Sequence, residues 1–171
     1  MPAAIASGML ALCGCETVVD ERIPNMAVSI DLSQAGQWQT WGVAAVGQAN
    51  YFVYQPGSER LPSGFPYKRS SATGFGGVLL VMGMDPFSLQ TMTPLAFDLS
   101  CPVEKSPAIR VAVDPESLEA VCPDCHSHYD VIMAGGAPLS GPAATGKRKY
   151  GLRRYSCLPT AFGGYLISNS L

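Results

Sequence analysis

Hydrophobic and polar residues alternate with the period of a β-strand in several segments. Residues 26–32 carry apolar side chains at every second position, which predicts a strand with one face on a core. Residues 77–84 form an unbroken apolar run of strand length, which predicts a central strand covered on both faces. Further strands are expected over 37–46, 50–54, 94–100, 109–113, 118–121, 152–157 and 164–168. No segment has clear helical periodicity, so the pattern predicts an all-β protein.

Turn-forming residues separate these strands. Residues 55–76 are dense in Gly, Pro and Ser and are expected to form a long irregular loop. The stretch Asp114-Pro115-Glu116-Ser117 is a turn signal between two strands, with proline in a turn-initiating position. The two strands should therefore pair as a hairpin. A second hairpin is expected at the end of the chain, over 152–157 and 164–168.

Composition limits the size and the partners of this fold. A chain of 171 residues is long enough for one domain with a real core. Only 14% of the residues are charged and the net charge is −2, so no electrostatic attraction to nucleic acid is expected. We predict one folded domain over residues 26–171, preceded by a polar linker over 16–25.

The first fifteen residues are apolar and end in small residues before a cysteine. Leu12-Cys13-Gly14-Cys15 resembles the lipobox of a bacterial lipoprotein signal peptide, with Cys15 as the lipidated residue. This resemblance implies a membrane-anchored protein on the extracytoplasmic side of the bacterial envelope, where unliganded thiols tend to oxidise. The first basic residue is Arg22, so the alternative is a short buried segment of an ordinary domain.

Candidate chemistry is concentrated between residues 101 and 130. This stretch holds three of the six cysteines and both histidines, namely Cys101, Cys122, Cys125, His126 and His128. The predicted hairpin brings the two Cys-Pro segments side by side. Cys-x-x-Cys is a common half-site for tetrahedral zinc or iron, because thiolates are preferred ligands of both metals. The sequence therefore predicts a metal site on this hairpin.

The motif from Cys122 to Asp130, followed by Gly141-Pro142-Ala143, resembles the cluster-binding subdomain of Rieske iron–sulfur proteins. The similarity spans about residues 98–143. It implies antiparallel sheets in a Rieske-like sandwich, with Cys101 and Cys122 at the positions of the two cysteine ligands of a [2Fe-2S] cluster.

The same resemblance assigns residues around the cluster. Ser127 and Tyr129 match the family residues whose hydroxyl groups hydrogen-bond the cluster sulfurs, and Gly141 and Pro142 belong to the matching proline loop. These four residues are expected to surround the metal ligands rather than to bind the metal.

The two ligand histidines of that family are replaced here. Val103 occupies the first histidine position and Cys125 the second. One interpretation is a variant [2Fe-2S] cluster or a single iron or zinc ion on Cys101, Cys122 and Cys125. The fourth ligand would then be one of the two histidines, His128 or His126.

Other interpretations of the cysteines stay open at this point. Cys101 could form a disulfide with Cys122 or Cys125, leaving a cofactor-free scaffold with a structural or partner-binding role. The Cys122-Pro123-Asp124-Cys125 segment also has the outline of a thiol redox pair, although no helix is predicted after it. Cys157 could pair with a remaining thiol or stay free.

Taken together, these features favour electron transfer over catalysis. No Ser-His-Asp arrangement, paired-carboxylate motif or phosphate-binding loop points to a hydrolase or a kinase. We expect a metal centre that exchanges electrons with a redox or envelope protein partner.

Overall fold

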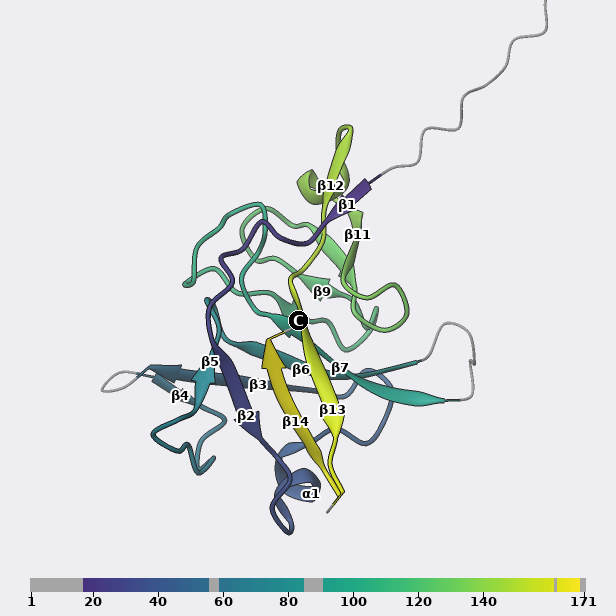
Figure 1. The fold of residues 1–171 in the computed structure, drawn as a ribbon. Coiled ribbons are helices and arrows are strands. Elements are labelled where there is room, and N and C mark those ends of the chain that lie inside the picture. Colours follow the sequence, from purple (N-terminus) through teal and green to yellow (C-terminus); the bar gives the residue numbers. More distant parts are fainter. Residues whose placement is uncertain (1–16, 56–58, 85–90, 162, 170–171) are drawn as a thin grey trace, which may run out of the picture.

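The computed structural model describes residues 17–55, 59–84, 91–161 and 163–169 (Figure 1). Its regular structure consists of strands together with one five-residue helix, α1 (Gln37–Trp41), and one 3-10 helix, η1 (Pro142–Ala144). The strands are β1 (Thr17–Val19), β2 (Val28–Asp31), β3 (Ala49–Gln55), β4 (Glu59–Leu61), β5 (Ala72–Thr73), β6 (Val78–Met84), β7 (Met92–Asp98), β8 (Ala112–Val113), β9 (Ala120–Val121), β10 (His128–Asp130), β11 (Ala137–Ser140), β12 (Arg148–Tyr150), β13 (Arg154–Pro159) and β14 (Tyr165–Asn169). The all-β prediction is confirmed.

Eight strands form one large antiparallel sheet in the order β4-β3-β6-β7-β13-β14-β2-β5. The sheet curls, so that its last strand returns toward β3: the backbone N–H of Tyr54 in β3 donates to Oγ1 of Thr73 in β5 at 3.2 Å. Figure 1 shows β5 beside β3, although five strands separate them in the sheet order. The expected final hairpin is present as β13 and β14.

The central strand β6 is covered on both faces, as its unbroken apolar sequence predicts. Val78, Leu80 and Met82 point into one hydrophobic cluster, while Leu79 and Val81 point into another. This division follows from the period of two along a strand. Burial on both faces therefore makes β6 the divider between two cores.

The first cluster, here called the inner core, lies on the concave face of the curled sheet, because strands from distant places in the sheet order contribute to it. Its buried members are Val28, Ile30, Leu32, Val43, Phe52, Phe65, Val78, Leu80, Met82, Ala96, Tyr155 and Ile167. The second cluster, here called the site-side core, lies on the other face. Its buried members are Val53, Leu79, Val81, Phe97, Leu99, Cys101, Val111, Ala120, Cys122, Tyr129, Val131, Ala143 and Leu152.

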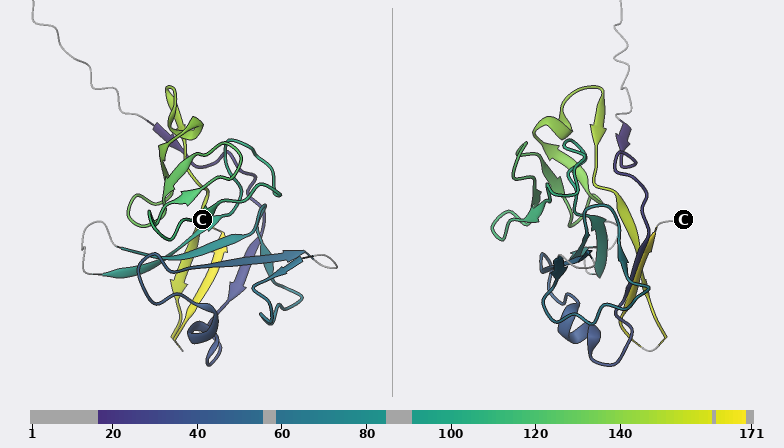
Figure 2. Two further views of the ribbon diagram at one scale, coloured as in Figure 1. Left: turned by 180° about the vertical axis from the view of Figure 1, so that it is seen from behind. Right: turned by 90° about the vertical axis from the view of Figure 1, so that its left-hand side faces the viewer.

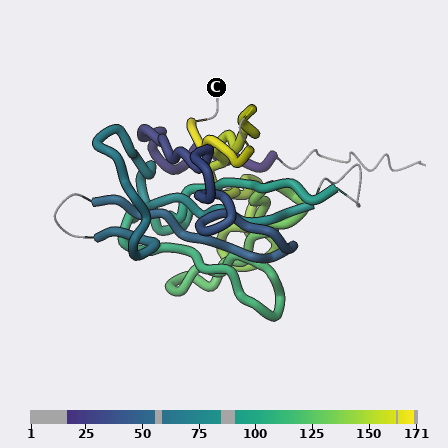
Figure 3. The backbone as a smooth tube through the Cα atoms, turned by 90° about the horizontal axis from the view of Figure 1, so that it is seen from below, coloured from purple at the N-terminus to yellow at the C-terminus, as the bar shows by residue number. Residues whose placement is uncertain are grey.

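A smaller four-stranded sheet, in the order β11-β10-β9-β8, covers the site-side core. Figure 3 shows this green segment on the opposite side of β3 and β6 from β2, β13 and β14, and the right-hand view of Figure 2 shows the same layering. The hairpin of β8 and β9 closes through the predicted turn, in which the N–H of Leu118 donates to the carbonyl of Asp114 at 2.8 Å. The candidate site is therefore built over one face of a rigid sheet.

The strand predicted over residues 37–46 is wrong, because residues 42–46 form no strand either. Residues 37–41 form the short helix α1, whose Trp38 and Trp41 both pack against the inner core. Trp38 also lies 4.4 Å from the ring of Tyr165, measured between ring centroids. A spacing of three places both indoles on one side of a helix, so the aromatic side chains that suggested a strand are half-buried by a helical turn instead.

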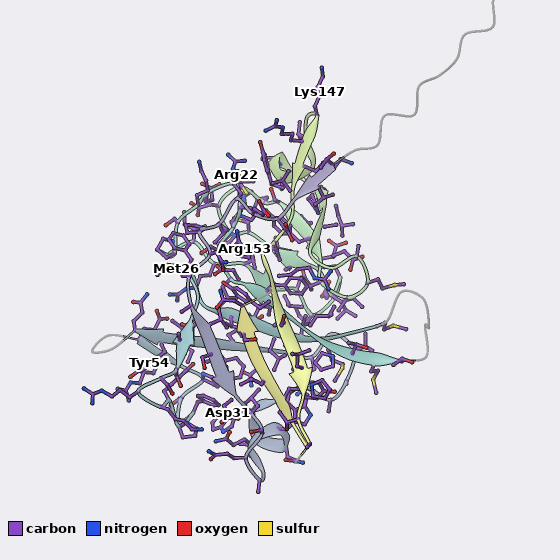
Figure 4. The ribbon with its side chains drawn as sticks, viewed as in Figure 1. Arg22, Met26, Asp31, Tyr54, Lys147 and Arg153 are labelled. Carbon is purple, nitrogen blue, oxygen red and sulfur yellow. The ribbon has the colours of Figure 1, made fainter. Side chains whose placement is uncertain are left out.

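The N-terminal part of the predicted linker packs onto the domain. Strand β1 pairs in parallel with β12, and Ile23 is fully buried. Arg153 Nε donates to the carbonyl of Ile23 at 2.7 Å, and the guanidinium of Arg22 lies 3.8 Å from the ring centroid of Tyr150. Figure 4 shows Arg22 and Arg153 at this junction. Residues 17–25 thus differ from the expected linker, because the buried side chain of Ile23 and the contact between Arg22 and the Tyr150 ring hold them against the domain.

Two further expectations change in detail. The long loop predicted over 55–76 contains two short strands, β4 and β5, which form the two edges of the large sheet. The strand predicted over 109–113 is regular only at 112–113, with an isolated bridge between Ser100 and Arg110 before it. Both segments are short edge elements, where sequence periodicity is weakest.

The expected lipidation site, Cys15, lies outside the described residues. No helix in the described ranges is long and apolar enough to cross a membrane.

Candidate metal centre

A buried carboxylate fixes the chain where it enters the site. Asp98, at the end of β7, is fully buried and accepts hydrogen bonds from the backbone N–H groups of residues 75–76 at 2.9 and 3.1 Å. It also accepts from the N–H of Ser100 at 2.7 Å and from the hydroxyl of Tyr155 at 2.6 Å. Four donors on one carboxylate hold the backbone immediately before Cys101, so the position of that cysteine is set by the sheet.

Two short loops carry the cysteines and share one backbone shape. The first cysteine loop covers residues 101–105 and the second covers residues 122–126, and both begin with Cys-Pro. In the first, the N–H of Lys105 donates to the carbonyl of Cys101 at 2.9 Å. In the second, the N–H of His126 donates to the carbonyl of Cys122 at 3.1 Å. Both closing residues, Lys105 and His126, have a φ of 53°. The loops are thus equivalent turns on neighbouring parts of the hairpin.

The loops bring three thiols together. The Sγ atoms of Cys101, Cys122 and Cys125 all lie within 4.8 Å of one another, and those of Cys101 and Cys125 are 3.6 Å apart. Cys101 and Cys122 are fully buried and Cys125 is half-buried. We call these three residues the cysteine trio. Their convergence is the geometry that a thiolate-bound metal requires.

None of the described cysteines forms a disulfide. The trio and Cys157 are all free, and 3.6 Å between Cys101 and Cys125 is far from the bonded sulfur distance of about 2.05 Å. Cys157 packs against the inner core, on the other side of the large sheet from the trio. The structure therefore favours the metal-site interpretation over the disulfide pairing that the sequence left open.

Hydroxyl groups lie next to two of the sulfurs. The Tyr129 hydroxyl is 3.3 Å from Cys101 Sγ, and Ser127 Oγ is 3.2 Å from Cys125 Sγ. Both residues are fully buried, and Ser127 Oγ also accepts a hydrogen bond from the N–H of Ala143 at 3.0 Å. Each hydroxyl can donate a hydrogen bond once its sulfur is a thiolate. The two residues named from the sequence as neighbours of the cluster are thus in contact with the trio.

The proline loop touches the second cysteine loop through Gly141. This glycine has φ 77° and ψ −168°, a region used almost only by glycine. A Cβ at Gly141 would lie 2.8 Å from Cα of Ser127 and 2.9 Å from the carbonyl oxygen of His126. Glycine is therefore required here for close approach as well as for conformation. Pro142 follows as the first residue of η1 and is exposed.

Gly141→Ala is expected to destabilise the protein by about 2–4 kcal/mol, because backbone strain and the clash with the second loop add together. The matched control is Gly146→Ala: its φ of 93° is also unfavourable, but a Cβ there would meet nothing within 4 Å. The control should cost only about 1–2 kcal/mol. Urea unfolding of both variants measures the difference. Equal losses would show that the contact at Gly141 contributes nothing.

The histidines do not join the trio. The group of described His, Cys, Asp and Glu residues with mutually close ligand atoms contains only the three cysteines. His128 Nδ1 lies 2.7 Å from Glu119 Oε2, and His126 is exposed. Together with Cys122 and Pro123 the two histidines line an open groove of about 640 Å³ beside the site. The structure therefore places both histidines in this groove and outside the group of three sulfurs.

Burial keeps the thiols of Cys122 and Cys125 protonated. Burial raises the pKa of Cys122 to about 12 and also raises the pKa of Cys125 above its ordinary value. Hydrogen bonds from the backbone N–H groups of Cys125 and Asp124 act on Cys122 in the opposite direction. Burial likewise raises the pKa of Tyr129, so its hydroxyl keeps the proton that it can donate. A metal must therefore displace protons from Cys122 and Cys125 in order to bind.

Because metal binding displaces these protons, the affinity for metal should depend on pH. Both thiol pKa values are raised, so Cys122 and Cys125 are neutral near pH 7 without metal and lose two protons on binding. Apparent affinity for Zn²⁺ should therefore fall as pH falls, by at least about 100-fold per pH unit, tenfold for each of these two protons. Competition with a coloured chelator between about pH 6 and pH 8, corrected for the chelator's own protonation, measures this slope. An affinity independent of pH would contradict proton displacement.

Comparison with protein-family models and with curated proteins finds no match to this chain.

Two functional contributors were missed from the sequence. Asp98 supports the first cysteine loop, and Glu119 orients His128. The sequence does carry a signal for Asp98, which is a charged residue inside the apolar strand 94–100. A buried carboxylate needs several hydrogen-bond donors, so such a residue is expected to organise its surroundings. The pairing of Glu119 with His128 follows from the register of β9 and β10, which the sequence does not reveal.

Proposed function

We propose that this protein is a Rieske-like electron-transfer protein whose metal centre is held by Cys101, Cys122 and Cys125. One observation carries the proposal: three sulfurs from two equivalent loops lie within 4.8 Å of one another, none in a disulfide. The all-β scaffold and the hydroxyls of Ser127 and Tyr129 support it further.

The spacing of the sulfurs fits a single ion better than a two-iron cluster. Tetrahedral zinc binds sulfur at about 2.3 Å, which places two sulfurs on the same ion about 3.8 Å apart. Cys101 and Cys125 are already 3.6 Å apart. In a two-iron cluster, ligands on different irons are separated by the cluster itself, so Cys125 would have to move away from Cys101. A mononuclear iron or zinc site needs less rearrangement of the loops.

The surrounding residues suit a redox role. An iron ion held there would supply a one-electron couple. Burial of Cys101 and Cys122 limits water at the inner side, while the half-exposed Cys125 lies at the surface and the groove reaches Cys122. A redox partner can therefore approach within a short distance of the sulfurs. With Cys15 as a lipid-bearing residue, this exchange would take place at the bacterial envelope membrane.

Tyr129→Phe tests how the hydroxyl tunes the centre. Removing a hydrogen-bond donor 3.3 Å from Cys101 Sγ leaves more negative charge on that sulfur, which stabilises oxidised iron. The reduction potential of the iron-loaded variant should shift to a more negative value, measured by spectroscopic redox titration. Tyr51→Phe removes a hydroxyl that accepts a hydrogen bond from the N–H of Val113 and is not bonded to a sulfur, so it should leave the potential unchanged. Equal potentials in all three proteins would exclude tuning by Tyr129.

The proposal is tested by purifying the protein without oxygen and measuring bound metals together with the visible spectrum. Near-stoichiometric iron with thiolate-to-iron absorption supports an electron-transfer centre. Stoichiometric zinc without colour would keep the metal site but replace electron transfer with a structural role. Colourless protein that holds less than a tenth of an equivalent of any metal, even after reduction and reconstitution, contradicts the proposal.

A further inference from the structure

We infer that Glu104 is the fourth ligand of the metal centre, and that this centre is a three-thiolate, one-carboxylate site. The inference rests on the proposed function, because it assigns a ligand to the same ion. The cysteine trio supplies three donors from two loops, whereas tetrahedral zinc or iron takes four.

The equivalence of the two cysteine loops identifies the position of the missing donor. Each loop starts with Cys-Pro, makes three residues of turn, and closes with an N–H bonded to the carbonyl of its first cysteine. Because the closing residues also share a φ of 53°, the loops can be matched residue by residue. The first positions are Cys101 and Cys122, and both supply sulfurs. The fourth positions are Glu104 and Cys125.

Burial follows the same correspondence at the first, fourth and fifth positions, whereas the second and third residues are more buried in the first loop. Glu104 and Cys125 are both half-buried, between a fully buried cysteine and an exposed closing residue. At the fourth position of the second loop, Cys125 directs its sulfur toward the sulfurs of Cys101 and Cys122. The same backbone position in the first loop is therefore suited to a donor on the same ion. Glutamate is a metal-binding residue type, and its carboxylate oxygen binds zinc or iron well.

The carboxylate of Glu104 is not engaged in another interaction within the described residues. Within the described ranges it has no hydrogen-bond or ion-pair partner. Its oxygens are not among the ligand atoms within 4.8 Å of all three sulfurs, so the side chain must rotate to bind the metal. The side chain has rotatable bonds that allow this without a change in the backbone hydrogen bond of the loop. A half-buried acid with no partner, three residues after Cys101 in the chain, is thus free to move onto an ion.

Other fourth ligands fit the structure less well. Val103, next to Glu104, has no donor atom and packs against the site-side core. His128 is held by Glu119 at 2.7 Å, and His126 is the exposed closing residue of its loop, the counterpart of Lys105.

A carboxylate in place of a fourth thiolate has a consequence for metal choice. Soft sulfur ligands select Cu(I) as well as zinc and iron, while an oxygen donor favours harder divalent ions. A site with three sulfurs and Glu104 should therefore hold Fe²⁺, Zn²⁺ or Co²⁺ and discriminate against Cu(I) more than a four-cysteine site would.

Cobalt binding to the reduced protein tests the assignment, because Co²⁺ reports sulfur ligands through its charge-transfer band. Glu104→Gln should lower Co²⁺ affinity by about tenfold or more. Glu104→Cys should raise the affinity and increase the charge-transfer absorbance by about one third, as expected when four thiolates replace three. Glu116→Gln removes the same charge from an exposed turn on the same hairpin and should match the wild type. Thermal unfolding of each metal-free variant verifies that the fold is retained.

The outcomes separate the two claims. If the wild type binds Co²⁺ tightly but Glu104→Gln binds equally well and Glu104→Cys adds no thiolate band, the Glu104 assignment is overturned and the trio stands. Loss of affinity in His128→Ala instead of Glu104→Gln would assign the fourth position to the histidine. If the wild type gives no thiolate-to-cobalt band at all, the metal centre itself fails, and the ligand assignment fails with it.

Discussion

Cys122→Ser is expected to abolish stoichiometric metal binding while leaving the protein folded. Cys122 is fully buried, lies within 4.8 Å of both other sulfurs and begins the second cysteine loop. Serine keeps the size of the side chain but is a poor ligand, because its hydroxyl stays protonated where a thiol loses its proton. Affinity for Zn²⁺ should fall by at least about 100-fold, measured by chelator competition at constant pH.

Cys157→Ser is the matched control for this loss. Cys157 is also a free thiol, and burial raises its pKa to about 12, but it packs against the inner core on the other face of the sheet. Its replacement should leave metal stoichiometry and affinity unchanged. If both variants lose metal to the same extent, binding depends on general destabilisation and not on the trio. Retention of full affinity in Cys122→Ser would remove that cysteine from the site.

Asp98→Ala is expected to destabilise the protein by about 3–5 kcal/mol. The substitution leaves three backbone N–H groups and the Tyr155 hydroxyl buried without an acceptor, and each lost partner is costly because water cannot replace it. Urea unfolding monitored by circular dichroism measures the loss. Because Asp98 fixes the N–H of Ser100, the first cysteine loop should also loosen and bind metal more weakly.

Two milder substitutions near Asp98 provide a scale for this loss of stability. Tyr155→Phe removes one of the four donors and should cost about 1–2 kcal/mol. Ser100→Ala removes a buried hydroxyl that has no hydrogen-bond partner in the described structure, so it should be close to neutral or slightly stabilising. If Asp98→Ala costs no more than Tyr155→Phe, the backbone donors at residues 75–76 and at Ser100 do not depend on the carboxylate.

Local sequence signals predicted most of the fold. Strand β2 follows from period-two alternation, β6 from an unbroken apolar run and β3 from β-branched and aromatic content, all of which depend only on neighbouring residues. The turn at Asp114-Pro115 predicted the hairpin, and the hairpin explains why the trio converges. Helix α1 was missed because Trp38 and Trp41 fit a strand by composition and a helix by spacing.

The rest depends on contacts between residues far apart in the chain. Strand β1 pairs in parallel with β12, and nothing in the sequence of either segment predicts this pairing. The donors to Asp98 come from residues 75–76 and from Tyr155, so its role appears only when three strands are in place. Similarly, the equivalence of the two cysteine loops rests on backbone hydrogen bonds and on φ at Lys105 and His126, which only the structure provides.

The most direct test of the central claim is X-ray absorption spectroscopy at the edge of the metal that the protein carries when purified without oxygen. The proposed centre predicts three sulfur ligands at about 2.3 Å, and the Cys122→Ser variant should not retain such a site. A first shell made only of oxygen and nitrogen atoms in the wild type would show that the ion is bound elsewhere, and would contradict a metal centre at Cys101, Cys122 and Cys125.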